Sequence, residues 1–193
     1  SHQPPATSPQ PPATNMNNLD QLDDTTLMQR FCRHHDNAAF GTLVSRHQKL
    51  LLNFFNRWGV QNDSEDLVQQ TFLRLYNYRD KYVATAQLKT FLLLLARQVQ
   101  IDDLRRRKSR EAMLEKLAAQ PRPEFVAPPR RSAGVAGDVD LADALATLPE
   151  ALRQVVELGV YQDLPYADVA KILEIPVGTV KSRMFNALAK LRD

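Results

Sequence analysis

Pro176 constrains the fold of the C-terminal part of the chain more than any other residue. It stands inside the stretch DLPYADVAKILEIPVGTVKSRMFNALAKLR, residues 163–192, between two short segments with helical spacing of apolar residues. The residue before a proline is pushed out of the helical region, so one helix cannot run through the whole stretch. The sequence therefore predicts two helices joined by a tight turn.

The second of these helices has a free face that carries hydrogen-bond donors and positive charges. At 100° per residue, the predicted buried stripe is Val177, Val180, Met184, Leu188 and Leu191. The predicted outward residues are Thr179, Ser182, Arg183, Asn186 and Lys190. Many basic amphipathic helices are only solvated surfaces. Two crossed helices with such a second face, however, are typical of the helix-turn-helix that enters the major groove of DNA.

The sequence also carries signals for the turn between these helices and for a helix upstream of them. Glu174 occupies the turn position where glycine is common, and a left-handed conformation there would cost about 1 kcal/mol. Upstream, Thr147 and Glu150 match a capping box, with Pro149 tolerated in the first turn of the helix that follows. The pattern predicts a supporting helix ahead of the helix-turn-helix.

The distribution of proline indicates the domain boundaries of the chain. Five of the twelve prolines lie in residues 1–12 and four more lie between Pro121 and Pro129. Such segments are typically extended or disordered. We therefore expect a disordered extension over 1–22, a helical body over 23–115, a flexible linker over 116–137 and a C-terminal module over 138–193. No run of alternating apolar and polar residues suggests a strand, so the predicted fold is all-α, with two small helical domains.

One helix of the first body has a leucine on its polar side. The segment SEDLVQQTFLRLYNY begins near Asp63 or Ser64, one of which is the expected N-cap, and the preceding helix stops at Gly59. The residues predicted to be buried are Val68, Phe72 and Leu75, and those predicted to be exposed are Asp66, Gln69, Gln70, Leu73 and Asn77. Leu73 is either an ordinary exposed leucine or an anchor for a partner helix.

The charges are distributed unevenly along the chain, although the formal net charge is only +3. Residues 104–131 hold nine Lys or Arg against three Asp or Glu, whereas residues 138–175 hold eight acidic residues against two basic ones. Arg105, Arg106, Arg107, Lys108 and Arg110 point in every direction around one helix, which costs self-repulsion unless an anion is near. Phosphate is the expected anion, and a solvated helix end is the alternative.

Several other classes of protein are disfavoured. The longest unbroken apolar run, FLLLLA at 91–96, is too short to span a bilayer, and nothing resembles a secretion signal. Cys32 is the only cysteine, so it cannot form an internal disulfide, and we expect it to be reduced and partly buried. His34, His35 and His47 lack metal-ligand spacing and no glycine-rich loop is present, which argues against an enzyme.

Three segments in order carry a family resemblance: DSEDLVQQTFLRLYNY, then FLLLLARQVQIDDLRRRK, and, after the proline-rich linker, ALATLPEALRQVVELGVYQDLPYADVAKILEIPVGTVKSRMFNALAKLR. Together they resemble the extracytoplasmic-function (ECF) class of bacterial RNA polymerase sigma factors, in the sigma-70 family. The resemblance runs from about residue 23 to the end. It implies a protein that binds core RNA polymerase, recognises promoters, opens the minus-10 strand and needs neither a cofactor nor a catalytic residue.

The resemblance also implies roles for individual residues. The core polymerase-binding residues would be Glu65, Asp66, Gln69, Gln70 and Leu73. The minus-10 element would be met by Lys81, Tyr82, Arg97, Gln98, Asp102, Arg105 and Arg106, with Tyr82 suited to stacking on a base taken out of the duplex. The minus-35 element would be met by Thr179, Lys181, Ser182, Arg183 and Asn186.

The sequence departs from the family pattern at three positions besides Glu174. Phe91 stands where the family usually has Trp, Gln98 where Asn is common, and Asn186 where Arg is frequent. These changes bear on which bases are preferred, because Asn suits adenine and Arg suits guanine.

The family also implies partners and a compartment. The expected partners are core RNA polymerase, promoter DNA and an anti-sigma protein, and the expected location is the cytoplasm, without membrane insertion. A two-domain activator that binds DNA without core polymerase is the alternative function.

Overall fold

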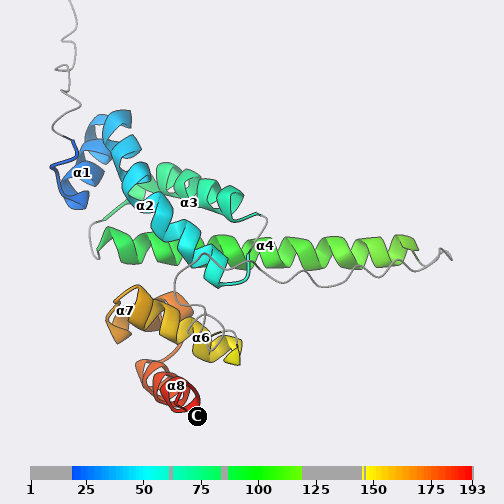
Figure 1. Cartoon of the computed structure of the whole chain (residues 1–193). Coiled ribbons are helices and arrows are strands. Elements are labelled where there is room, and N and C mark those ends of the chain that lie inside the picture. Colours follow the sequence, from blue (N-terminus) through cyan, green and yellow to red (C-terminus); the bar gives the residue numbers. More distant parts are fainter. Residues whose placement is uncertain (1–18, 61–62, 84–86, 119–144, 146, 193) are drawn as a thin grey trace, which may run out of the picture. The chain divides into compact units, whose positions relative to one another are not determined.

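The structure, a computed structural model, describes residues 19–60, 63–83, 87–118, 145 and 147–192. Every regular element in these ranges is helical, as Figure 1 shows, which confirms the predicted all-α fold for the described chain. The elements are α1 Asp24–His34, α2 Asn37–Arg57, α3 Ser64–Tyr78, the 3₁₀ turn η2 Arg79–Lys81, α4 Leu88–Ala118, α6 Glu150–Val156, the π-helical turn η3 Glu157–Tyr161, α7 Tyr166–Leu173 and α8 Val177–Lys190. By its contacts the chain divides into two compact units, residues 1–46 and 47–193.

The first unit holds α1 and the first half of α2. Asp23 caps α1, because its carboxylate accepts the Thr26 backbone N–H at 2.6 Å. The ring of Phe31 stacks on that of Phe40, with centroids 4.6 Å apart. Arg46 connects α2 to the segment before α1, because its guanidinium donates a hydrogen bond to the Leu22 carbonyl at 3.0 Å. Cys32 is half-buried, as expected.

In the second unit, α2 is terminated by Gly59, a residue type that readily adopts the left-handed conformation. Gly59 has φ 81°, in the left-handed region, and the Val60 N–H turns back to the Phe55 carbonyl at 3.0 Å. The predicted stop at Gly59 is confirmed. Phe54 and Phe55, both fully buried, lie edge to face with centroids 5.3 Å apart, and Trp58 packs on Phe54 at 4.5 Å.

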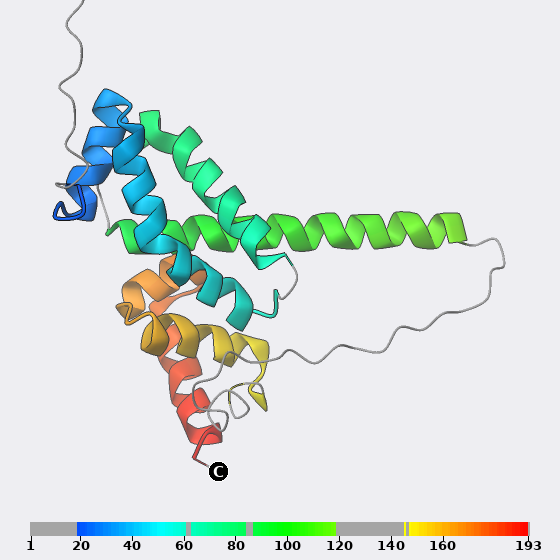
Figure 2. The same cartoon turned by 45° about the horizontal axis from the view of Figure 1, so that its top comes forward.

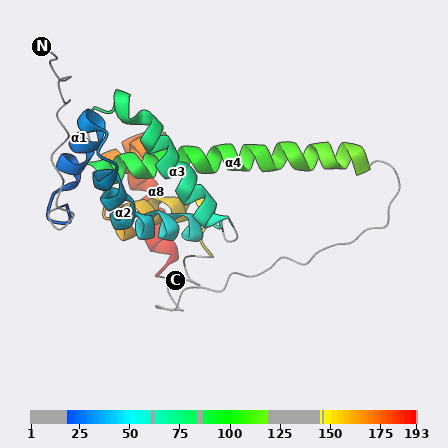
Figure 3. The ribbon, with the colours of Figure 1, turned by 90° about the horizontal axis from the view of Figure 1, so that it is seen from above.

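Helices α3 and α4 lie side by side (Figures 1 and 2). The predicted buried stripe of α3 is confirmed, with Val68, Phe72 and Leu75 all buried. The first half of α4 is buried nearly all round. Its second half, residues 104–115, is exposed at every position, and Figure 3 shows this half of α4 running on past α3. Helix α4 ends at Ala118, inside the predicted linker, while residues 119–137 of that linker lie outside the described residues.

Helices α6, α7 and α8 pack together as a helix-turn-helix with a supporting helix. The turn is built on Glu174, which has φ 55° and ψ 43°. Glu174 therefore adopts the left-handed conformation, for which the expected cost is about 1 kcal/mol. The turn still closes as a helix C-cap should, because the Ile175 N–H reaches the Ala170 carbonyl at 3.1 Å.

Two predictions for this module are wrong. Val177 and Leu188 are exposed, and the core stripe of α8 is instead Val180, Met184 and Ala187. The stripe is narrower and rotated because α8 is covered only where α6 and α7 touch it. The capping box also fails, since Pro149 takes the N-cap position and α6 begins at Glu150.

Candidate nucleic-acid interface

The outer face of α3 is polar except for one leucine. Glu65, Asp66 and Gln69 are exposed, and Gln70 is half-buried and donates to the Asp66 carboxylate at 2.9 Å. Leu73 lies among them with 59% of its surface exposed. The predicted arrangement of this face is confirmed, and it is an acidic surface with a single apolar centre.

The start of α3 is held differently from the prediction. Asp63 is the N-cap residue, but its side chain makes no capping hydrogen bond. Its carboxylate pairs instead with Arg107 of α4 at 2.7 Å. Asp103 pairs with the same guanidinium at 2.6 Å, and these two neighbours raise the pKa of Arg107 although partial burial opposes them. Arg107 therefore fastens α3 to α4.

The Arg97 side chain is half-buried and packs against neighbouring side chains. Burial lowers the pKa of its guanidinium, and the charges of Glu150 and Glu174 oppose that effect. Its guanidinium carbon lies 4.9 Å from the Trp58 ring centroid, and it donates to Gln100 at 3.0 Å. A cation held in this way has a fixed position, which suits contact with a phosphate or base edge. Gln98, one residue on, is exposed.

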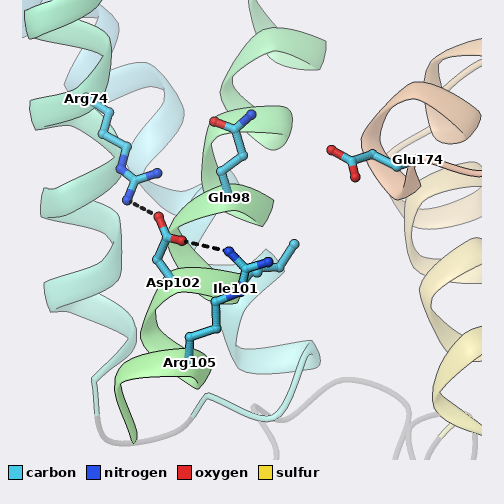
Figure 4. Close-up of a pocket in the computed structure, with 6 residues that line it drawn as sticks. All are labelled: Arg74, Gln98, Ile101, Asp102, Arg105 and Glu174. Atoms are coloured by element: carbon cyan, nitrogen blue, oxygen red, sulfur yellow. Dashed lines mark hydrogen bonds and ion pairs between the residues drawn. The ribbon is translucent and has the colours of Figure 1, made fainter. Parts of the chain in front are cut away.

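Asp102 is the centre of a charged pocket on α4, drawn in Figure 4. It accepts a hydrogen bond from Arg74 of α3 at 2.7 Å and pairs with Arg105 at 3.7 Å. The hydrogen bond from Arg74 is the main cause of the lowered pKa of Asp102, so this carboxylate stays ionised at neutral pH. The other residues that line the pocket are Gln98, Ile101 and Glu174.

The basic cluster that follows is only partly neutralised. Arg106 donates to Gln70 at 3.5 Å, and Arg105 keeps 78% of its side chain exposed despite its pairing with Asp102. Lys108 and Arg110 form no ion pair with any residue in the described ranges. The cluster therefore keeps positive charge available for an anionic ligand.

The segment between α3 and α4 brings aromatic rings together. Tyr82 lies edge-on to Phe91, with centroids 5.6 Å apart, and the Tyr78 ring is tilted against that of Phe91, with centroids 5.3 Å apart. Lys81 beside them is exposed. Residues 84–86, in the segment between Tyr82 and α4, lie outside the described residues. Three aromatic rings, those of Tyr78, Tyr82 and Phe91, thus gather where α4 begins.

The recognition helix α8 presents most of its predicted residues outward. Lys181, Ser182 and Asn186 are exposed, whereas Thr179 and Arg183 are half-buried. The Ser182 hydroxyl donates to the Thr179 carbonyl at 3.1 Å, so only its acceptor capacity is left for a ligand while that bond holds.

Two residues of these surfaces were missed by sequence reasoning. Phe185 is 73% exposed and lies within one helical turn of Lys181, Ser182 and Asn186. Phe185 lies four residues after Lys181, on the same side of the helix, so its place on this face could have been predicted from the spacing. Arg74 carries no such signal, because its partner Asp102 lies on another helix.

Neither a metal site nor a membrane span is found in the described ranges. There, no three His, Cys, Asp or Glu side chains gather closely enough to hold a metal ion. Similarly, none of the helices described is both long and apolar enough to cross a bilayer.

Comparison with known proteins decides the family. The model of sigma-70 region 2 matches residues 43–110, and that of sigma-70 region 4 matches residues 138–191. The chain is 29% identical over 176 residues to the ECF RNA polymerase sigma-E factor of Haemophilus influenzae, covering 87% of this chain and 93% of that protein. The chain belongs to the ECF class of the sigma-70 family.

Solved structures share the fold of this sigma factor. CnrH, solved in complex with the cytosolic domain of CnrY, has a TM-score of 0.62 at 22% identity, covering 88% of this chain and 94% of that one. The sigma factor RpoE of Bartonella quintana, solved with the anti-sigma factor NepR, has a TM-score of 0.54 at 24% identity, covering 77% and 93%.

The family fixes the general function. Sigma factors direct promoter-specific transcription, and as a family they are not enzymes. A DNA-binding activator is not favoured, because the matches include region 2 as well as the helix-turn-helix.

Proposed function

We propose that this sigma factor binds core RNA polymerase through the outer face of α3, by Glu65, Asp66, Gln69, Gln70 and Leu73. The observation that carries this assignment is the exposure of Leu73, which lies among polar groups on a helix whose residues Leu67, Val68, Phe72 and Leu75 are all buried. An apolar anchor ringed by polar residues is the usual composition of a binding hot spot.

The α4 surface takes the minus-10 element in this proposal. Arg97, Gln98, Arg105 and Arg106 hold the separated strand, since they place three cations and a neutral amide along one helix, with Arg97 held by its neighbours and Arg105 largely exposed. Lys81 joins them, and Tyr82 stacks on an unpaired base. Asp102 acts by orienting Arg105, and Arg74 orients Asp102 in turn. Cations that track the backbone beside aromatic rings are the general means of holding single-stranded nucleic acid.

The outer face of α8 takes the minus-35 element. Lys181, Ser182 and Asn186 lie toward base edges or phosphates, and Phe185 adds an apolar surface for a thymine methyl group. Thr179 and Arg183, which are half-buried, flank this surface and contact the backbone or a base.

Replacing Phe185 with Ala is expected to weaken minus-35 binding by about 1–3 kcal/mol and to relax preference for thymine at one position. Val160→Ala is the matched control, since Val160 is an exposed apolar residue of the same module outside α8. Binding of holoenzyme to promoter variants measures the effect. Equal losses on all promoter variants would show that Phe185 does not read a base.

Transcription by purified core polymerase tests the proposed function as a whole. Core supplemented with this chain should produce promoter-specific transcripts, and sequencing their 5′ ends should reveal two shared elements upstream. Core polymerase works in the cytoplasm, so we place the chain there. Transcription that also requires another sigma factor would instead identify an activator.

An anti-sigma protein is the proposed regulator. The two structural relatives support it, because one was solved with CnrY and the other with the anti-sigma factor NepR. A regulator shifts the free protein only by binding one state better than another, so it should compete with core polymerase for α3 or α8. Simultaneous binding of both without loss of transcription would exclude competition.

A further inference from the structure

Ser109 is the one hydroxyl-bearing residue in the exposed half of α4, residues 104–115. Its side chain is exposed, and it lies between Lys108 and Arg110, two cations that form no ion pair within the described ranges. The serine and its two neighbours belong to neither the proposed core-binding surface nor the proposed promoter-binding surfaces. A hydroxyl group is therefore held in the middle of positive charge that the proposed contacts do not use.

Ser109 shares its side of α4 with two of the proposed minus-10 cations. Arg106 and Arg105 precede it by three and four residues, which places them on the turn before it, about 4.5 and 6 Å away along the helix axis. Arg105 is largely exposed beside Asp102, and Arg106 donates to Gln70 across the long distance of 3.5 Å. Both guanidinium groups can therefore turn toward an anion on Ser109.

The cation that links α3 to α4 lies on the other side of the helix. Arg107 is two residues before Ser109, which places it about 160° away around the axis. Its guanidinium pairs with Asp63 at 2.7 Å and with Asp103 at 2.6 Å. An anion on Ser109 therefore leaves the link between α3 and α4 intact.

The residues before Ser109 are unlike those before any other serine or threonine that the structure describes. All four of them, residues 105–108, are Lys or Arg. Each of the other described serines and threonines has at most one Lys or Arg among the four residues before it. A binding groove lined with acidic side chains would select Ser109 from the rest by charge complementarity.

The backbone around Ser109 is also easy to open. Residues 104–115 are exposed at every position, and Figure 3 shows this half of α4 running on past α3. A helical stretch with so little packing is marginal in water, so local unfolding there costs little free energy. Ser182 differs, because its hydroxyl donates to the Thr179 carbonyl and α8 packs on α6 and α7. An enzyme that must reach a serine side chain finds the lower barrier at Ser109.

We propose that Ser109 is a phosphorylation site for an ATP-dependent serine kinase with an acidic substrate groove, and that the phosphate switches off strand binding by α4. The switch rests on the proposed role of Arg105 and Arg106 at the minus-10 element. In the transfer, the Ser109 Oγ attacks the γ-phosphorus of ATP, and a new O–P bond forms. The bond between that phosphorus and the bridging oxygen of the β-phosphate breaks, ADP leaves, and the hydroxyl proton passes to the catalytic base of the kinase.

The phosphate competes with DNA for the same two cations. It adds about −1.5 to −2 charges and three acceptor oxygens, with which Arg105 and Arg106 pair in place of the DNA backbone. Each phosphate contact with single-stranded DNA contributes about 0.7 to the slope of log K against log salt concentration. Loss of two contacts should lower that slope by about 1.4, which corresponds to binding about tenfold weaker at about 0.15 M salt.

Mapping of phosphate by mass spectrometry tests the site. The full-length chain is incubated with ATP and an extract of its native cells, or with a purified serine kinase that selects preceding basic residues. Both reactions should modify Ser109. Neither should modify Ser45, an exposed serine of α2 with no Lys or Arg among the four residues before it. Modification by the purified kinase alone would show that Ser109 is accessible but would overturn its use as a natural site, and modification by neither would overturn both.

Phosphoserine inserted at position 109 by a reassigned codon tests the switch. Holoenzyme containing that chain should bind a fluorescent A/T-rich single strand about tenfold more weakly than unmodified holoenzyme, with the smaller salt slope. Phosphoserine at position 45 is the matched control, since it adds the same charge at an exposed helical serine, and it should leave binding unchanged. Equal losses for the two chains would overturn the switch.

Arg105→Ala separates this switch from the minus-10 assignment. If Arg105→Ala weakens strand binding while phosphoserine at position 109 does not, the switch alone is overturned. If Arg105→Ala leaves strand binding unchanged, the minus-10 assignment fails and the switch falls with it. The mapped phosphate still decides in that case whether Ser109 is a modification site.

Discussion

Replacing Leu73 with Glu is expected to weaken the binding of core RNA polymerase by at least about 2 kcal/mol, roughly thirtyfold in Kd. Leu73 is the one exposed leucine on an otherwise polar face of α3, and a carboxylate there would both remove the apolar anchor and add charge to an already acidic surface. The fold should be unaffected, because the side chain contacts solvent. Fluorescence anisotropy of the labelled chain titrated with core polymerase measures the change.

Leu114 supplies a matched control for that experiment. It is 58% exposed against 59% for Leu73, and it lies on the far half of α4, away from α3. Leu114→Glu therefore makes the same chemical change at the same exposure and should leave core binding unchanged. Equal losses for the two variants would mean that added negative charge, rather than the position of Leu73, weakens the complex.

Replacing Phe54 with Ala should destabilise the protein by about 3–5 kcal/mol. Phe54 is fully buried, lies edge to face with Phe55 and supports the Trp58 ring, which in turn lies under Arg97. This loss is a large part of the free energy of unfolding of a typical domain, which is about 5–15 kcal/mol. Urea unfolding followed by circular dichroism measures it.

Phe185→Ala is the control for Phe54→Ala, since it removes the same ring from a 73% exposed position. Surface substitutions of this kind usually change stability by less than about 0.5 kcal/mol. A midpoint for Phe54→Ala that matches the Phe185→Ala midpoint would show that Phe54 is not part of the cooperative core. Because Arg97 rests on Trp58, we also expect Phe54→Ala to weaken strand binding near the minus-10 element.

The two amphipathic helices differ in how well their spacing predicted burial. For α3 the buried and exposed residues were assigned correctly, because α3 is long and its apolar positions form one well-defined stripe. For α8 the same reasoning placed Val177 and Leu188 inside and omitted Ala187. Helical spacing gives the direction of an apolar face but not its width, which depends on how much of the helix its neighbours cover. Alanine is also neutral in such a pattern, so Ala187 gave no signal.

The contacts between α3 and α4 that organise the charged residues could not be predicted. Arg74 and Asp102 are 28 residues apart, and Asp63 and Arg107 are 44 apart. Nothing in local spacing links such pairs, because they meet only once α3 and α4 have packed. The sequence suggested that Asp63 or Ser64 would cap α3. Asp63 takes the N-cap position, but the tertiary ion pair with Arg107 engages its carboxylate instead of a capping hydrogen bond.

The π-helical turn η3 fixes how many residues the chain must have between α6 and α7. The Gln162 N–H reaches the Glu157 carbonyl at 3.0 Å, five residues back, one more than in an α-helix. Residues five apart in an α-helix point about 140° away from each other, whereas here the Gln162 amide meets the Glu157 carboxylate. Surface loops usually tolerate a residue gained or lost. In chimaeras assembled from related chains, residues 157–162 should therefore be inherited as one block of fixed length.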